Sequence, residues 1–177
     1  SGISRHASRD LTDMVMTELQ HDLSAKYGRQ WNRRGMWNRN YSETRLPAVP
    51  SMILEILSHQ NFADMRMGHD PNFKFTVARS VYKAILKHTA TMHGTDYVVQ
   101  PLPVTRFAIE EGSKHTFRLS WQGVVDMQEP SANPRGYIVY TRLGHGGWDN
   151  GTYVKNNYYT FHAEPGLVYS FKVTAVN

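Results

Sequence analysis

The stretch Thr116-Phe117-Arg118-Leu119-Ser120-Trp121, residues 116–121, decides the fold of the second half of the chain. Apolar and polar side chains alternate along it, which is typical of a β-strand with one face in a core. Comparable segments lie before and after it at spacings of about ten residues. They cover 104–109, 137–142, 152–154, 158–161 and 168–176. This rhythm predicts an all-β sandwich over residues 103–177.

The first half of the chain instead has the three- and four-residue spacing of helices. Residues 8–23 predict an amphipathic helix that Ser8 caps and Gly28 follows as a terminator. A second helix is expected to start at Asp70-Pro71 and reach Lys87. The apolar face of the first is Leu11, Met14, Val15, Leu19 and Leu23. That of the second is Phe73, Val77, Val81, Ala84 and Ile85, with Lys74, Lys83 and Lys87 elsewhere.

A short apolar run lies between these helices. Residues 48–57, Ala-Val-Pro-Ser-Met-Ile-Leu-Glu-Ile-Leu, resemble a strand that is covered on both faces. Helix, strand and helix predict part of an α/β layer over residues 1–92, and a Gly- and Pro-marked linker over 93–102. The Arg-, Asn- and Trp-rich segment up to Tyr41 is interpreted as loop with one short strand.

Composition limits the classes of partner. The 177 residues carry a net charge of +5 and no cysteine, so an anionic partner is favoured and thiolate metal sites are excluded. Basic residues gather only around Arg29, Arg33, Arg34 and Arg39, without a nucleic-acid-binding motif, which favours a solvated basic face. No apolar run is long enough to span a membrane. Residues 1–4 do not resemble a signal peptide, and we expect the chain to be a fragment.

Glu55 is the candidate catalytic residue, because a carboxylate inside an apolar strand is costly to bury without a partner. One interpretation is structural: Glu55 ends the strand and pairs with an arginine or a backbone donor. The other is functional: Glu55 is a general base facing a cleft at the carboxyl edge of an α/β sheet, where ligands tend to bind.

Residues 42–61, Ser-Glu-Thr-Arg-Leu-Pro-Ala-Val-Pro-Ser-Met-Ile-Leu-Glu-Ile-Leu-Ser-His-Gln-Asn, resemble zinc-dependent N-acetylmuramoyl-L-alanine amidases. In that family a proline, an apolar strand and a catalytic glutamate precede an asparagine. The resemblance covers about the first ninety residues and implies an incomplete parallel-sheet amidase-like domain with Glu55 as base. It also implies a zinc ion in the complete protein. The family's zinc ligands precede the first helix here, so we expect this chain alone to hold no metal and to be inactive.

Two further residues are candidates for the site, and a third is rejected. His59, four residues after Glu55, and Asn61 are candidates for substrate binding, although a surface role suits His59 as well. His145 lies in Leu143-Gly144-His145-Gly146-Gly147, which is similar to the family's first zinc motif. We assign it to a turn, because it follows Glu55 and an alternating strand. After its glutamate the family has Gly-Phe, where this chain has Leu57-Ser58.

Residues 116–121, 136–140 and 165–177 resemble strands B, C and F of a fibronectin type III domain. Trp121 would then fill the core between two sheets, and the hydroxyl of Tyr169 would return to the backbone at a corner. The final strand of such a domain is absent, which would leave an edge able to pair with another chain or with the rest of the parent polypeptide.

Two functions remain open. The first is a bacterial cell-wall amidase that acts on peptidoglycan in a secreted, periplasmic or cell-surface location, as type III modules beside hydrolase domains imply. The second is a non-catalytic or carbohydrate-binding region of a secreted polysaccharide-degrading protein, such as a xanthan lyase. Trp31, Trp37 and Trp148 lie in polar surroundings, where they either stack on sugars or are buried under loops.

Overall fold

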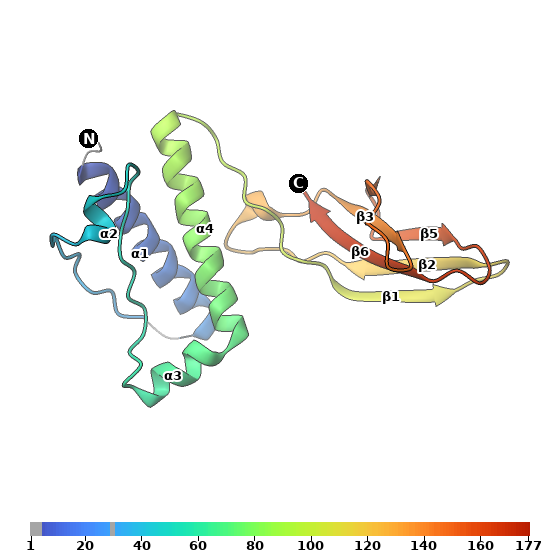
Figure 1. The fold of residues 1–177 in the computed structure, drawn as a ribbon, viewed down its shortest axis with the longest axis horizontal. Helices are drawn as coiled ribbons and strands as arrows, with labels where there is room; N and C mark the ends of the chain where they lie inside the picture. The colour runs from blue at the N-terminus through green and yellow to red at the C-terminus, as the bar shows by residue number, and fades with distance from the viewer. Residues whose placement is uncertain (1–4, 29–30) are drawn as a thin grey trace. The chain divides into compact units, whose positions relative to one another are not determined.

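The computed structural model describes residues 5–28 and 31–177, which form two units that divide between Tyr97 and Val98. Helices make up the regular structure of the first unit, and antiparallel sheets that of the second (Figure 1). The first four residues and Arg29 of the predicted basic cluster lie outside the described residues. The predictions made for them are therefore left open.

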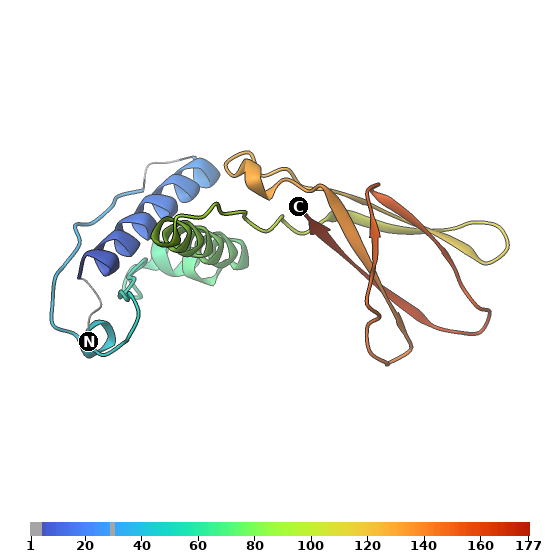
Figure 2. The ribbon, with the colours of Figure 1, turned by 90° about the horizontal axis from the view of Figure 1, so that it is seen from above.

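Two long helices form the body of the first unit. α1 (Arg5–Tyr27) and α4 (Pro71–His93) lie side by side and run in opposite directions (Figures 1 and 2). Lys26 donates a 2.6 Å hydrogen bond to Thr76, and His88 Nε2 lies 3.1 Å from the carbonyl oxygen of Ala7. Two short helices, α2 (Ser42–Arg45) and α3 (Phe62–His69), complete the unit.

The helix ends follow from their capping residues. Gly28 has a φ of 61° directly after α1, a left-handed conformation that glycine adopts without strain, as the sequence predicts. Asp70 accepts a 2.9 Å hydrogen bond from the backbone N–H of Asn72, and Pro71 begins α4, which confirms the predicted start. The predicted Ser8 cap is wrong, because α1 begins before it. Ser8 Oγ instead accepts the backbone N–H of Ser51 at 3.2 Å.

The core between α1 and α4 contains most of the predicted apolar residues. Leu11, Val15, Leu19 and Leu23 of α1 pack with Phe73 and Ala84 of α4. Two predictions for α4 are wrong: Ile85 is 48% exposed, and Lys83 is only 2% exposed. Lys83 faces α1 because Glu18 and Asp22 of that helix pair with it. With Lys83 on the inner side of α4, Ile85 lies on the side that faces solvent.

A buried polar network joins the two helices beside this core. Lys83 Nζ lies 2.8 Å from Asp22 Oδ1 and 3.4 Å from Glu18 Oε2. The hydroxyl of Ser80 donates a 2.6 Å hydrogen bond to the other carboxylate oxygen of Asp22. Burial raises the pKa of Asp22, but the hydrogen bonds from Lys83 and Ser80 and the charge of Lys83 outweigh it. The pKa of Asp22 is therefore held below its ordinary value.

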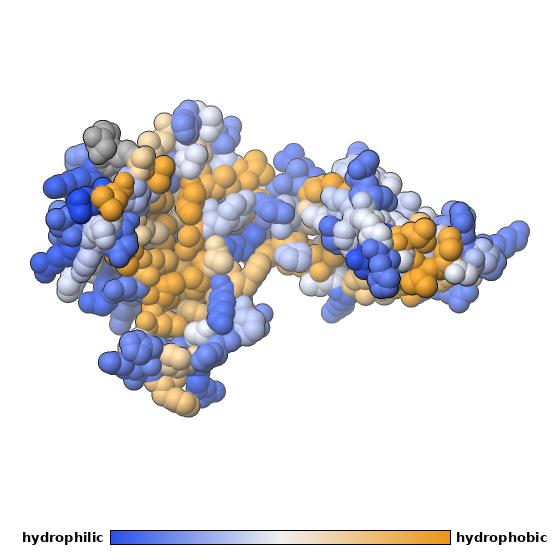
Figure 3. All heavy atoms as spheres, viewed as in Figure 1, coloured by the Kyte–Doolittle hydropathy of each residue, from blue (hydrophilic) through white to orange (hydrophobic). Residues whose placement is uncertain are grey.

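The strand predicted over 48–57 is absent from the described structure. No residue described up to Tyr97 belongs to a β-strand, so this segment has no neighbour with which to form a parallel sheet, and the strand predicted before Tyr41 is also missing. The segment nevertheless alternates in exposure: Met52 and Leu54 contact the helical core, whereas Ile53 and Glu55 are exposed. Figure 3 shows apolar surface on this side of the helices.

The second unit has the predicted sandwich-like arrangement of antiparallel strands. One sheet contains β1 (Thr105–Glu111), β2 (Thr116–Gln122) and β5 (Tyr158–His162), in that order. The other contains β4 (Thr152–Val154), β3 (Gly136–Leu143) and β6 (Tyr169–Val176), with β6 at an edge. A 3₁₀ turn, Pro130–Ala132, precedes β3. The strand bounds agree with those expected from the alternation.

Two predicted structural residues of this unit are confirmed. Trp121 is 3% exposed, and its ring contacts Tyr137 of the other sheet edge-on, with centroids 5.3 Å apart. The hydroxyl of Tyr169 accepts a hydrogen bond from the backbone N–H of Glu164 at 3.3 Å, which forms the corner. Leu119, Val139 and Ala175 fill the rest of the core between the sheets.

Candidate functional site

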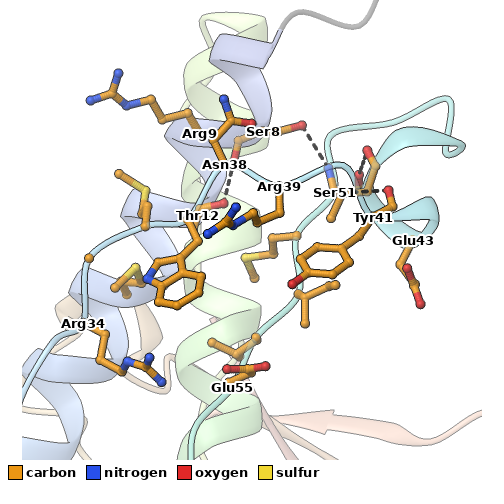
Figure 4. Close-up of a pocket in the computed structure, with 18 of the residues that line it drawn as sticks. Ser8, Arg9, Thr12, Arg34, Asn38, Arg39, Tyr41, Glu43, Ser51 and Glu55 are labelled. Atoms are coloured by element: carbon orange, nitrogen blue, oxygen red, sulfur yellow. Dashed lines mark hydrogen bonds between the residues drawn. The ribbon is translucent and has the colours of Figure 1, made fainter.

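A broad groove runs along α1 in the helical unit. Its volume is about 1740 Å³, and its walls are one side of α1, the loop and short helix over 31–45, and the segment 47–56. Pockets for small molecules usually measure about 300–1,000 Å³. The groove is larger than such pockets (Figure 4).

The loop that forms one wall is attached to α1 at its beginning. The carbonyl of Trp31 accepts a 3.0 Å hydrogen bond from Gln20, and its ring stacks on Phe73 with centroids 5.8 Å apart. Arg33 forms an ion pair with Asp13 and donates a hydrogen bond to Thr17 at 2.9 Å. Trp31 thus packs against the core between α1 and α4. This agrees with the interpretation that its ring is covered by the protein, although helices and not loops cover it.

Farther along, the loop presents a cationic and aromatic surface. Trp37 is 67% exposed, and the guanidinium carbons of Arg34 and Arg39 each lie 5.6 Å from its ring centroid. Among the described residues, six arginines and two glutamates line the groove, namely Arg5, Arg9, Arg33, Arg34, Arg39 and Arg45 with Glu43 and Glu55. This excess of positive charge favours an anionic ligand. Three of the basic residues that the sequence places on a solvated face, Arg33, Arg34 and Arg39, therefore line a concave surface.

Glu55 lies in the groove wall formed by residues 47–56. In Figure 4 it lies at one end of the groove and Arg9 at the other, with Arg39 and Tyr41 between them. Its side chain is exposed because the alternation of the segment turns Leu54 toward the helices. Within the described residues Glu55 forms no hydrogen bond or ion pair. The structural interpretation, a carboxylate paired inside a sheet, thus has no counterpart in these residues.

The other two predicted site residues lie apart from the groove lining. Asn61 caps α3, because its side-chain oxygen accepts the backbone N–H groups of Ala63 at 2.9 Å and Asp64 at 3.3 Å. This role occupies the side chain that we expected to bind substrate. His59 is exposed in the turn before it. Neither residue is among those that line the groove.

The donor set for a zinc ion is not present in the described part of the chain. No group of three or more His, Asp or Glu side chains there is placed to hold a metal ion. His145 lies in the turn between β3 and β4, as its sequence context predicts. The described residues therefore do not fit the zinc ion that the amidase resemblance implies.

Sequence reasoning missed the groove itself. The gathering of arginine and tryptophan over 31–41 was its available signal, but the concave shape depends on contacts between distant residues. Two hydrogen bonds of Ser51 hold the wall formed by residues 47–56 in place. Its backbone N–H donates to Ser8 Oγ, and its hydroxyl donates to the carbonyl of Thr44 at 3.0 Å.

No model of a known protein family and no curated protein matches this chain. Among the described helices, none is both long and apolar enough to cross a membrane. Because no match indicates a function, a proposal has to rest on the residues of the groove and of the sandwich.

Proposed function

We propose that this chain is part of an exported bacterial cell-wall hydrolase that cleaves the amide between N-acetylmuramic acid and L-alanine of peptidoglycan. The observation that carries the proposal is Glu55, an exposed carboxylate without a partner among the described residues, in the wall of a large cationic groove. The resemblance of residues 42–61 to the amidase family assigns Glu55 the role of general base.

The chemistry asked of Glu55 is proton transfer. Water attacks the carbonyl carbon of the lactyl amide while Glu55 accepts the proton of the water. The C–N bond then breaks, and the proton passes to the departing amine of L-alanine, which leaves a lactyl carboxylate on the glycan. The resemblance implies that zinc assists this reaction. Its ligands would have to come from other parts of the complete protein, since the described residues offer no such set.

The positive charge of the groove fits the peptide part of this substrate. The stem peptides of peptidoglycan carry carboxylates, and Arg9, Arg39 and Arg45 line the groove without forming an ion pair among the described residues. Guanidinium groups bind carboxylates through paired hydrogen bonds. We expect these arginines to hold the stem while the scissile amide lies beside Glu55.

Exposure alternates over residues 52–55, as it does in a strand with one covered face. Met52 and Leu54 contact the helical core, whereas Ile53 and Glu55 are exposed. We infer that other segments of the complete protein pair with this segment and form the parallel sheet of an amidase-like domain. The second unit is proposed to be a fibronectin type III-like module, on the basis of its sheet order, Trp121 and the Tyr169 corner.

The test compares Glu55→Gln with Glu43→Gln in the complete protein. Glu43 is the other glutamate of the groove, so its variant controls for the loss of one negative charge. We expect Glu55→Gln to lower amide hydrolysis by about 10²–10⁴-fold and to leave thermal unfolding unchanged, because the side chain is exposed and unpaired. Near-normal turnover of Glu55→Gln, or an equal loss in both variants, would contradict the assignment.

A second candidate is the non-catalytic region of a polysaccharide-degrading protein, such as a lyase. It is favoured by the cations around Trp148 on the second unit. The sequence of the complete protein separates the two functions. An amidase should carry Gly-His-Gly-Gly, glutamate and Ser-x-His segments before the first helix, whereas the second candidate should lack them.

A further inference from the structure

The outer face of the sheet β4-β3-β6 carries a second cluster of aromatic and basic side chains. The Arg142 guanidinium carbon lies 4.9 Å from the ring centroid of Trp148, and Lys172 Nζ lies 5.2 Å from it. Lys172 also lies 4.3 Å from the ring centroid of Tyr140, its partner across β3 and β6. Trp148 remains 40% exposed. We call Tyr140, Arg142, Trp148 and Lys172 the outer cluster.

The loop between β3 and β4 holds Trp148 in this position. The Asp149 carboxylate accepts the backbone N–H groups of Thr141 and Gly151, each at 3.0 Å, so its charge is directed into the loop backbone. Gly151 has a φ of 75°, and a Cβ there would lie only 2.4 Å from Ile138. Glycine therefore lets the loop fold down onto the sheet. These contacts lie within the chain, so the cluster is preorganised.

The two cations of the cluster are not neutralised within the structure. Neither Arg142 nor Lys172 forms an ion pair with a described carboxylate. Arg142 donates a 3.3 Å hydrogen bond to Ser170, while its buried Nε has no hydrogen-bond partner. Along this face β3 contributes Ile138, Tyr140 and Arg142, and β6 contributes Ser170, Lys172 and Thr174. None of these is acidic, so the face attracts an anion.

From this arrangement we propose that the outer cluster binds a sugar that carries a carboxylate, in the form of peptidoglycan glycan from which the peptides have been removed. Trp148 would contact the apolar face of the sugar ring, and Arg142 and Lys172 would bind the carboxylate. The choice of glycan rests on the proposed function, because amide hydrolysis leaves a free lactyl carboxylate on each muramic acid. The second unit would then keep the enzyme on glycan that it has already processed.

The test measures binding of the full chain to peptide-free glycan prepared with an unrelated amidase, by isothermal titration calorimetry. The same glycan with its carboxylates reduced to alcohols is the matched ligand. Trp148→Ala and Lys172→Gln probe the cluster. Arg118→Gln is the control variant, because Arg118 lies 4.4 Å from the Tyr158 ring centroid in an equivalent pair on the other sheet.

We expect each cluster variant to weaken binding about tenfold, whereas Arg118→Gln changes the dissociation constant less than about twofold. Reduction of the carboxylates should weaken binding at least as much. Glu55→Gln should bind the glycan like the unchanged chain, because Glu55 lies in the first unit and the outer cluster in the second. The binding measurement can therefore succeed even if Glu55 proves not to be catalytic. Equal binding of the reduced glycan, equal loss in Arg118→Gln, or binding only to uronate polymers or DNA would overturn the proposal. Far-ultraviolet circular dichroism checks that each variant is folded. If Trp148→Ala fails to fold, Lys172→Gln still tests the cluster, because Lys172 is exposed.

Discussion

Replacing Lys83 by methionine should destabilise the helical unit more than any other lysine substitution in α4. Lys83 is 2% exposed and lies 2.8 Å from Asp22 and 3.4 Å from Glu18. Methionine keeps most of the volume but removes the charge, so among the described residues Asp22 would keep only Ser80 and His21 as partners. Removing one member of a buried ion pair typically costs about 3–5 kcal/mol. That is a large part of the total free energy of unfolding of a domain, about 5–15 kcal/mol.

Urea unfolding followed by circular dichroism at 222 nm measures this loss, because the α-helices all lie before Tyr97 in the described chain. With a denaturant dependence of about 2 kcal/mol per molar urea, the midpoint should fall by roughly 2 M. Lys87→Met is the matched control: Lys87 pairs with Glu18 at 2.7 Å, but its side chain is 25% exposed. It should cost about 1 kcal/mol or less.

A double variant, Asp22→Leu with Lys83→Met, separates the ion pair from simple packing. It removes both charges, and Ser80 keeps the carbonyl of Thr76 as an acceptor at 3.0 Å. Apolar replacement of a whole buried pair is often neutral, so most of the lost stability should return. The reasoning is refuted if Lys83→Met costs no more than Lys87→Met, or if the double variant is the least stable of the three.

Three further predictions concern pH, the sandwich and metal. Since the pKa of Asp22 is lowered in the folded chain, its contribution to stability is complete above the ordinary value of about 3.9 and is lost as the pH falls through the folded pKa. Unfolding between pH 6 and 3 should show this loss, and Asp22→Asn should reduce it. Trp121→Ala should destabilise the second unit by about 3–5 kcal/mol, measured from near-ultraviolet circular dichroism, whereas a loss below about 1 kcal/mol would contradict its core position. The chain alone should retain no zinc after dialysis, and one equivalent found by metal analysis would require another donor set.

The sandwich could be predicted from the sequence almost strand by strand. Alternation fixes which residues of 116–121 face inward, and the core between two sheets accepts only one such register. Trp121 and Tyr169 were identifiable because a large aromatic in a strand and a tyrosine at a corner have few alternative environments. Helix α4 was equally clear at its start, since Asp70 and Pro71 supply a cap and a first turn.

The helical unit was harder because its details depend on contacts between distant residues. Lys83 looks like a surface residue until Asp22 and Glu18, sixty positions away along the chain, are placed beside it. An apolar run such as 48–57 predicts a strand only where another strand is available for pairing. Among the described residues of this unit there is none, so Met52 and Leu54 pack on helices instead.

The candidate site shows the same division. Glu55 could be singled out because a lone carboxylate in an apolar run is unusual, and it does lie in a groove. Asn61 could not be separated from a helix cap by sequence alone, since asparagine before a helix suits both roles. The arginines of the groove were visible as a cluster, but their shared orientation was not.

The most direct test of the central claim is to identify the bond that the complete protein breaks in peptidoglycan. Mass spectrometry of the products, with chemical labelling of new amino and reducing ends, reports this bond without assuming which residue is catalytic. The proposed function predicts stem peptides with a free L-alanine amine and intact glycan chains that carry lactyl carboxylates. New reducing ends or unsaturated sugars without free L-alanine would show a glycan-cleaving enzyme and would contradict the assignment of Glu55 to amide hydrolysis.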